Sequence, residues 1–584
     1  MNLRRLSLLW VVAFGCDATQ RADPDALPLE TAPPMVMGRL PQTRLVEPEA
    51  PEPEPEPGDP ETPEPEPARP ETEPSPSATA TASDSLTPAV AMNALDRPPS
   101  GQDAPRGPAA APITSAGTPA TETLRSGPAT AAQRAMAKEI QDQVSCLRGR
   151  PFREDVAVEF QSMDDFRSFI QGELSREQKS PQGRREQRLL KAVGLINFDE
   201  DLIAMIERAT LEQAAAYYDP RENTFYIVKA MPDIMLRATM AHELQHALQD
   251  QHSQALDAYT KGAFDTLDAG LAARFVVEGE ASLVGNAWML LTAAGLPMLG
   301  DVMPSPCTEG PTASTDRAMF WSSLRDMTID IAGQTRAAVQ NPGLLERLLT
   351  QALSPSVAES MRKLDTLPNF AYYTMVPPYT FGSFAMYKVL ESKGWKWNGI
   401  DRLFERMPAT TAEVLHPAKL IKGVRYPAPQ LWKSAEHPFA TKGWRVDPRD
   451  QVGELGLRIV LMNGGANERA AKRAAQGWGG DSVQVWTRRR GAAEFLAYDW
   501  NLRAEGPAQA SALKTALWSA VERRRGELDL LGEVSPIDSA SGLLVFAYTG
   551  HQNHRRFGRM TWSPSGVVLS EGWLEPPTGV RVLP

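Results

Sequence analysis

Two histidines and a glutamate have the types and spacing that suit metal chemistry. His242 and His246 are four positions apart, and Glu243 directly follows the first of them, in the pattern HExxH. On an α-helix, positions i and i+4 lie roughly 40° apart, so both imidazoles face the same point. The pattern suits two ligands of a tetrahedral zinc ion, with Glu243 beside them as general base for a water molecule.

The residues around this pattern favour a helix that packs in a core. Apolar residues recur between the histidines and just outside them, and two of only seven histidines in the chain fall in this one register. The alternative is chance, because HExxH occurs by accident and a histidine pair on a surface helix is normally just solvated. The apolar context favours the metal site over that alternative.

A catalytic zinc site takes a third protein ligand, commonly His or Glu. The metzincin pattern would need Gly at position 249 and His at 252; His252 is present, but Gln249 departs from the pattern. The second option is the apolar run over residues 274–281, which contains Glu278 and Glu280. Buried carboxylates are unfavourable unless they are paired or bound to a metal, whereas a helix edge in water would need no such partner.

The order of these segments resembles the gluzincin group of zinc metallopeptidases, in which a Glu on a second helix follows HExxH. The run Val277-Glu278-Gly279-Glu280-Ala281 resembles the EGxA segment of that group. The resemblance implies that Glu278 is the third ligand. Glu280 is then expected to contact the ligand residues and not the metal. Residues 378–382 resemble the PYxxG segment of the aminopeptidase branch, which implies that Tyr379 stabilises the tetrahedral oxyanion.

A closer likeness is to a set of uncharacterised bacterial and archaeal proteins that carry HELTHALQDQ, EGxA and STEQxLHP segments. The matching residues here are 242–251, 278–281 and 410–417, and the resemblance runs from about Tyr217 to Leu420. The gap between the second histidine and Glu278 is longer than in the aminopeptidases, and no GxMEN-type segment precedes the metal helix. Aminopeptidase specificity therefore does not carry over from the resemblance. Endopeptidase action, carboxypeptidase action and hydrolysis of a non-peptide amide or ester all stay open.

Two further polar residues lie near these motifs. Asp250, four residues after His246, is expected either to orient an imidazole or to be a plain surface residue. His416 lies in the STEQxLHP-like segment and is either an oxyanion donor or a structural histidine at a turn. A hairpin expected at 216–228, before a metal helix that Pro232 opens, is either a substrate-binding edge or an ordinary buried hairpin.

The N-terminal residues predict export. Arg4 and Arg5 form a positive region, residues 6–14 a short apolar core, and Cys16 follows as in a bacterial lipoprotein. We therefore expect a signal peptide over residues 1–15 and a lipid anchor on Cys16. The protein would then lie in the bacterial cell envelope, periplasmic or on the outer surface, and attach to the membrane through lipid alone. Cys146 and Cys307 are either a disulfide pair or two buried thiols.

The composition divides the rest of the chain. Residues 16–130 are rich in Pro and Glu and predict a disordered tether, because almost no apolar area is available to offset the entropy of ordering. Residues 131–430 predict a mainly helical, zincin-like metallopeptidase domain with a small sheet, beginning with a helix over residues 131–148. Residues 445–584 predict a smaller α/β domain without a motif, with strands at 457–462, 483–487, 543–549 and 566–569 and helices at 468–476 and 508–524. The fold class expected is therefore α+β and multidomain.

The sequence favours an exported zinc metallohydrolase, a peptidase acting on a peptide or protein substrate. A net charge of −11 argues against a nucleic-acid partner. One alternative is a non-catalytic envelope lipoprotein that keeps the fold as a binding or structural module, and another is a coincidental motif in a helical scaffold. Intact His242, Glu243 and His246 favour the enzyme.

Overall fold

The computed structural model describes residues 125–293, 367–431, 437–439 and 443–578, apart from gaps at 214, 230, 232, 255, 257, 259–263 and 533–534, and a few residues between 322 and 328. The expected signal peptide, Cys16, most of the tether, Pro232 and Cys307 lie outside the described residues. Residues 119–584 belong to one compact unit, so the boundary expected between 430 and 445 falls inside it. No helix among the described residues is long and apolar enough to cross a membrane.

The described residues are mixed α and β, and those between 125 and 430 are mainly helical. The helix expected over Ala131–Arg148 (α1) is confirmed at both ends: Thr130 and Gln133 form a capping box, and Gly149 ends the helix in the left-handed conformation. The described helices that follow it in this region are α2 (Met163–Lys179), α3 (Pro181–Val193), α4 (Leu202–Gln213), α5 (Asp233–His252), α7 (Leu267–Ala293), α12 (Asn369–Met375), α13 (Pro377–Ser392), α14 (Asn398–Glu405), α15 (Thr411–Leu415) and α16 (Pro417–Lys422).

A small sheet packs against α5. Its strands are β1 (Gly127–Pro128), β2 (Ala157–Phe160), β3 (Ala216–Asp219) and β4 (Thr224–Ile227), in the order β1-β2-β4-β3. The expected hairpin is confirmed as the antiparallel pair β3 and β4, whereas β2 and β4 are parallel. Among the described residues, the first regular element begins at Gly127, slightly before Ala131, and β3 is the edge strand nearest α5.

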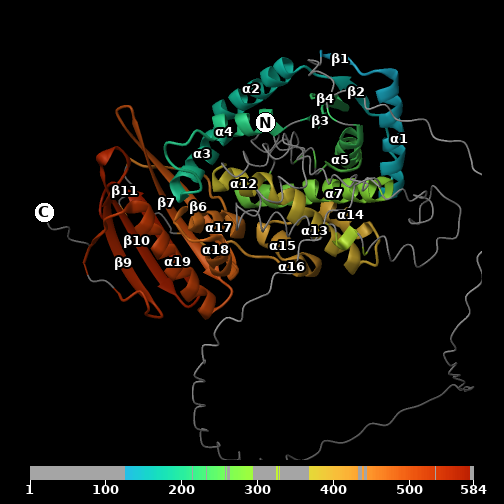
Figure 1. Ribbon diagram of the computed structural model, residues 1–584. Coiled ribbons are helices and arrows are strands. Elements are labelled where there is room, and N and C mark those ends of the chain that lie inside the picture. The colour runs from blue at the N-terminus through green and yellow to red at the C-terminus, as the bar shows by residue number, and fades with distance from the viewer. Residues whose placement is uncertain are drawn as a thin grey trace, which may run out of the picture. The chain divides into compact units, whose positions relative to one another are not determined.

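Three helices carry the motifs. Figure 1 shows α7 running between α5 on one side and α13 on the other, and both contact it. At the crossing of α7 and α13, Gly279 faces Gly382 so closely that a Cβ on Gly279 would lie 2.4 Å from the Gly382 carbonyl carbon. Only glycine permits this backbone contact, which fixes the spacing between the EGxA and PYxxG segments.

The C-terminal part is an antiparallel sheet with helices. The strands run in the order β5-β6-β7-β11-β10-β9-β8, and α19 lies along the sheet (Figure 1). The bounds are β5 (Arg445–Val446), α17 (Gly453–Asn463), α18 (Glu468–Ala475), β6 (Trp478–Arg490), β7 (Ala493–Ala504), α19 (Pro507–Arg525), β8 (Asp529–Leu530), β9 (Gly542–Thr549), β10 (Arg555–Ser563) and β11 (Gly566–Trp573).

The strand expected over residues 457–462 is wrong, because these residues belong to helix α17. Leu457, Ile459, Val460 and Leu461 are all buried. A short, continuous apolar run is typical of a buried strand and of a buried helix alike, so periodicity could not separate the two.

The start of α7 is held by the C-terminal part. Asp450 Oδ1 accepts a hydrogen bond from Leu267 N at 2.7 Å, and the Gln451 carbonyl accepts one from Asp268 N at 3.1 Å. These contacts satisfy amides that a helix N-terminus otherwise leaves unpaired. Buried apolar residues of both parts also share one core, from Leu244 on α5 to Val460 on α17.

Candidate metal centre

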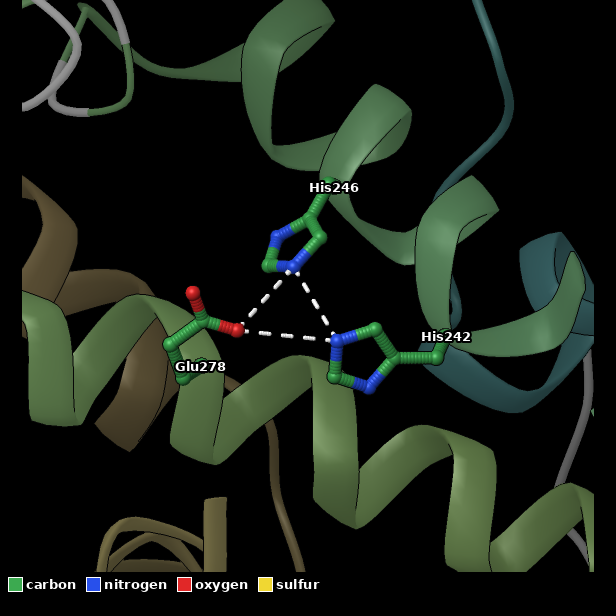
Figure 2. Close-up of side chains that lie close together, drawn as sticks. All are labelled: His242, His246 and Glu278. Carbon is green, nitrogen blue, oxygen red and sulfur yellow. Dashed lines mark hydrogen bonds and ion pairs between the residues drawn. The ribbon is translucent and has the colours of Figure 1, made fainter. Parts of the chain in front are cut away.

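Helices α5 and α7 bring three ligand-type atoms to one point. Figure 2 shows His242 and His246 projecting from α5 toward Glu278 on α7. The two Nε2 atoms are 3.2 Å apart, and Glu278 Oε2 lies 3.4 Å from His246 Nε2 and 3.6 Å from His242 Nε2. A tetrahedral zinc with bonds of about 2.0–2.1 Å holds its ligand atoms about 3.3 Å apart. The three atoms are therefore spaced as zinc requires.

The chemistry of the three side chains also fits a cation. Glu278 is fully buried, yet neither of its carboxylate oxygens has a hydrogen-bond partner. An unpaired, buried carboxylate costs free energy unless a positive charge lies beside it. Two imidazoles and one carboxylate are a common protein ligand set of catalytic zinc sites.

In the metal-free site, a bound proton supplies part of the positive charge that balances Glu278. Burial lowers the pKa of His242. Burial also acts to lower the pKa of His246, but the adjacent Glu278 carboxylate outweighs it and raises that pKa to about 9. Burial would raise the pKa of Glu278, but the two histidines and the Arg274 charge lower it to about 2. At neutral pH the metal-free site therefore holds a proton on His246 against the Glu278 charge.

Glu243 is positioned by the edge strand. Its Oε2 accepts a hydrogen bond from the backbone N–H of Tyr218 on β3 at 3.0 Å, while its Oε1 is buried without a partner. Burial, with the Glu278 charge, raises the pKa of Glu243 to about 8. One oxygen of the expected general base is thus anchored and the other is unengaged.

Asp250 is connected to this strand. Its Oδ2 accepts a hydrogen bond from the Tyr218 hydroxyl at 2.9 Å. The side chain that meets an imidazole is instead Gln249, whose Oε1 lies 2.9 Å from His246 Nδ1. At His246 the imidazole is therefore oriented by Gln249, the role that was expected for Asp250.

Gln249 belongs to a hydrogen-bond relay that ends on a buried arginine. Its Nε2 donates to the Val277 carbonyl at 3.0 Å and to Glu280 Oε2 at 2.8 Å, which leaves its Oε1 to accept from His246 Nδ1–H. Arg148 Nε donates to the other oxygen of Glu280 at 2.6 Å. The relay fixes the tautomer of His246, so that the Nε2 lone pair faces the metal position.

Tyr379 lies beside the first histidine. Its ring stacks on that of His242, with centroids 5.6 Å apart and an angle of 19° between the planes. Tyr379 is three residues from Gly382, whose backbone contacts α7 at Gly279. The glycine crossing therefore places Tyr379 next to the ligand cluster.

Two histidines considered as functional residues lie elsewhere. His252, near the end of α5, has its Nε2 2.7 Å from the Pro151 carbonyl and is outside the ligand cluster found among the described residues. His416 Nε2 lies 2.8 Å from Glu454 Oε2 on α17, and Glu454 also pairs with Arg458. His416, between α15 and α16, therefore links the two parts through Glu454, and its side chain caps neither helix.

Sequence reasoning missed three contributors: Gln249, the Tyr218 amide and Arg274. Gln249 stands inside the HELTHALQDQ-like segment, so that segment carried a signal for it. The Tyr218 contact uses a backbone amide, which leaves no mark on the sequence. Arg274 precedes Glu278 by one helical turn, and an arginine in an apolar run was a signal that could have been read.

Comparison with known proteins reaches only the C-terminal part. A family model described as a domain of unknown function, DUF8575, matches residues 433–540. No curated protein and no solved structure matches the chain. The ligand cluster lies outside the matched segment, whereas Asp450 and Gln451, which hold the start of α7, lie inside it.

Proposed function

We propose that the protein is a zinc-dependent hydrolase of peptide bonds, with His242, His246 and Glu278 as metal ligands. The observation that carries the proposal is the spacing of the three buried ligand atoms, at 3.2–3.6 Å, around a carboxylate with no hydrogen-bond partner. The gluzincin resemblance of the HExxH, EGxA and PYxxG segments supports it and suggests a zincin-like fold for the part that carries them.

When bound, zinc would act as a Lewis acid and lower the pKa of a water molecule toward neutrality. Glu243 would take a proton from the attacking water on Oε1, while the Tyr218 amide holds Oε2 in place. The water oxygen bonds to the substrate carbonyl carbon, the C–N bond breaks, and Glu243 gives the proton to the leaving amine. The charge of the bound metal favours the ionised Glu243 that this step needs.

Tyr379 acts on the substrate oxygen. Its ring stacks on His242, and its hydroxyl donates a hydrogen bond to the oxygen that becomes negative in the transition state. Strand β3 lies beside Glu243, but all four of its residues are buried and its Tyr218 amide already bonds to Glu243. The hairpin therefore positions the base, and no substrate-binding edge is proposed for it. The N-terminal pattern around Cys16 supports an exported, lipid-anchored enzyme. Growth with a radioactive fatty acid would test this, because the wild-type protein should carry the label and the Cys16→Ala variant should not.

The test measures metal content and cleavage together. The purified wild-type protein should hold about one zinc ion per chain and cleave members of a mixed peptide library. His246→Ala should lose both properties, whereas His252→Ala, on the same helix but outside the cluster, should keep both.

The other outcomes separate the alternatives. Zinc binding without cleavage of any peptide would show a metal-stabilised binding module. Zinc content at background level in the wild-type protein would show that the motif is coincidental.

A further inference from the structure

Arg274 is a buried cation that the proposed reaction does not use. It lies on α7 four residues before Glu278, so the two side chains project from the same face of the helix. Only 7% of its surface is exposed, and its Nε and Nη2 atoms are both buried without a hydrogen-bond partner. Among the described residues, no carboxylate forms an ion pair with it.

The two unpaired atoms form one edge of the guanidinium plane. That edge is the fork with which arginine binds a carboxylate through two parallel N–H···O bonds. A buried arginine elsewhere in the chain shows the usual solution: Arg148, at 4% exposed, is paired with Glu280 and Asp401. The charge of Arg274 acts on Glu278 and lowers the pKa of that carboxyl, but neither Glu278 oxygen bonds to the fork, so two buried N–H groups stay unpaired. Such a fork suits an anion that arrives with the substrate.

The charges around the proposed metal position also favour an anion. Zinc carries two positive charges and Arg274 one, whereas Glu278 and an ionised Glu243 carry two negative charges. Glu280 is already neutralised by Arg148. The loaded site would thus keep at least one excess positive charge in a buried setting, where charge interactions are strong.

We propose that Arg274 is a substrate-binding residue that takes a carboxylate of the peptide beside the scissile bond. This inference rests on the proposed function and deepens it, since it assigns the enzyme a preference for acidic peptides. The carboxylate is either the free C-terminus, which would make the enzyme a carboxypeptidase, or an Asp or Glu side chain. Both present the same two oxygens to the fork, so the experiment has to separate them.

The binding test uses the zinc-loaded, full-length Glu243→Gln variant, so that peptides are not consumed. Four pools of mixed-sequence hexapeptides are compared by calorimetry: free or amidated at the C-terminus, each with Glu or Gln at a central position. One acidic form should bind about 10- to 100-fold more tightly than its neutral counterpart. The C-terminal pair of pools reports a terminal carboxylate, and the Glu/Gln pair reports a side chain.

Adding Arg274→Met to that protein should remove the preference, and Arg274→Lys should retain part of it, since lysine keeps the charge without the fork. Equal binding of all four pools, or binding of none, would overturn the inference. If peptides are cleaved while the pools bind equally, the inference fails and the proposed function stands. If no peptide is cleaved by the wild-type protein while the preference persists, the proposed function fails and the carboxylate site stands.

A stability measurement separates binding from a structural role without any activity assay. In the ligand-free protein, Arg274→Met should change the melting temperature little, because losing the attraction between Arg274 and Glu278 is offset by removing a buried guanidinium that has no hydrogen-bond partner on Nε or Nη2. The matched control Arg148→Met should lower it, because it leaves Glu280 buried without its arginine. A decrease in Arg274→Met as large as that in Arg148→Met would show that Arg274 supports the fold, and would overturn the inference.

Discussion

The phenol ring of Tyr379 lies nearly parallel to the imidazole ring of His242, with 5.6 Å between their centroids. A residue that touches a metal ligand but is not one can act on the substrate oxygen bound next to that metal. Tyr379→Phe preserves the ring stack and removes only the hydroxyl. We expect zinc content to stay unchanged and turnover to fall by about 10²-fold or more, the usual effect of losing one oxyanion donor. Turnover equal to wild type would reduce Tyr379 to a packing role.

Glu243→Gln tests the general base. Glutamine keeps an oxygen for the Tyr218 amide and the size of the side chain, but it cannot accept the proton. Zinc should remain bound, and turnover of a good peptide substrate should fall by about 10²- to 10⁴-fold. Steady-state kinetics beside metal analysis makes the comparison. A variant as active as wild type would contradict the mechanism while leaving the metal site intact.

Gln249→Leu tests the relay behind His246. The change removes both the acceptor of the His246 N–H and the donor to Glu280. Zinc affinity, measured by competition with a chelator, should weaken by about 10- to 100-fold. Gln251→Leu is the control, because Gln251 bonds to backbone groups at residues 153 and 154, away from the ligands. Equal zinc affinity in the two variants would show that the relay does not orient the ligand.

Zinc affinity should rise with pH below about 9. In the metal-free protein the pKa of His246 is raised to about 9, so zinc must displace a proton from it, whereas Glu278, with its pKa lowered to about 2, is already ionised. Displacing this proton, and the proton that Glu243 holds below its pKa of about 8, makes the affinity increase about ten- to a hundredfold per pH unit between pH 6 and 8. Calorimetry in buffers with different ionisation enthalpies would count the released protons. An affinity independent of pH in this range would contradict the assignment.

Asp268, at the start of α7, should make the fold less stable as pH rises. Burial raises its pKa well above the usual value against the hydrogen bonds from Thr411, and the charges of Asp481 and Glu454 add to the rise. The folded protein therefore keeps a proton that the unfolded chain releases above about pH 4, so unfolding becomes easier by up to about 1.4 kcal/mol per pH unit. Asp268→Asn cannot ionise and keeps the oxygen that Thr411 contacts.

Denaturant unfolding of both proteins checks this sign. The two should be similar in stability near pH 4, and the variant should be the more stable at pH 7. Parallel stability curves would mean that Asp268 is ionised in the folded protein.

The sequence predicted those parts of the site whose information is local. His242, Glu243 and His246 share one helix, and the EGxA segment distinguished Glu278 from Glu280. The relay could not be predicted, because its partners are far apart along the chain: Gln249 meets Val277, and Glu280 meets Arg148. The helical elements were predictable where capping residues mark them, as at Thr130 and Gly149.

The C-terminal part was predicted less well, for a similar reason. The expected strands and helices at 468–476, 483–487, 508–524, 543–549 and 566–569 are confirmed, but β7 and β10 were missed and α17 was taken for a strand. α17 is buried on most sides by α12, α15 and α18, so residues 457–462 contain a single polar residue, Arg458, and show no helical period by themselves.

Because Asp450 and Gln451 accept hydrogen bonds from the first turn of α7, the protein is not expected to be separable into two independent fragments. The helix that carries Glu278 and Arg274 obtains part of its N-terminal cap from a stretch more than 150 residues later in the chain. A gene fragment that stops near residue 430 would therefore encode every proposed ligand and yet lack the groups that finish their helix. A descendant that exchanged its C-terminal part for an unrelated one would face the same deficit, so the two parts are expected to be inherited together.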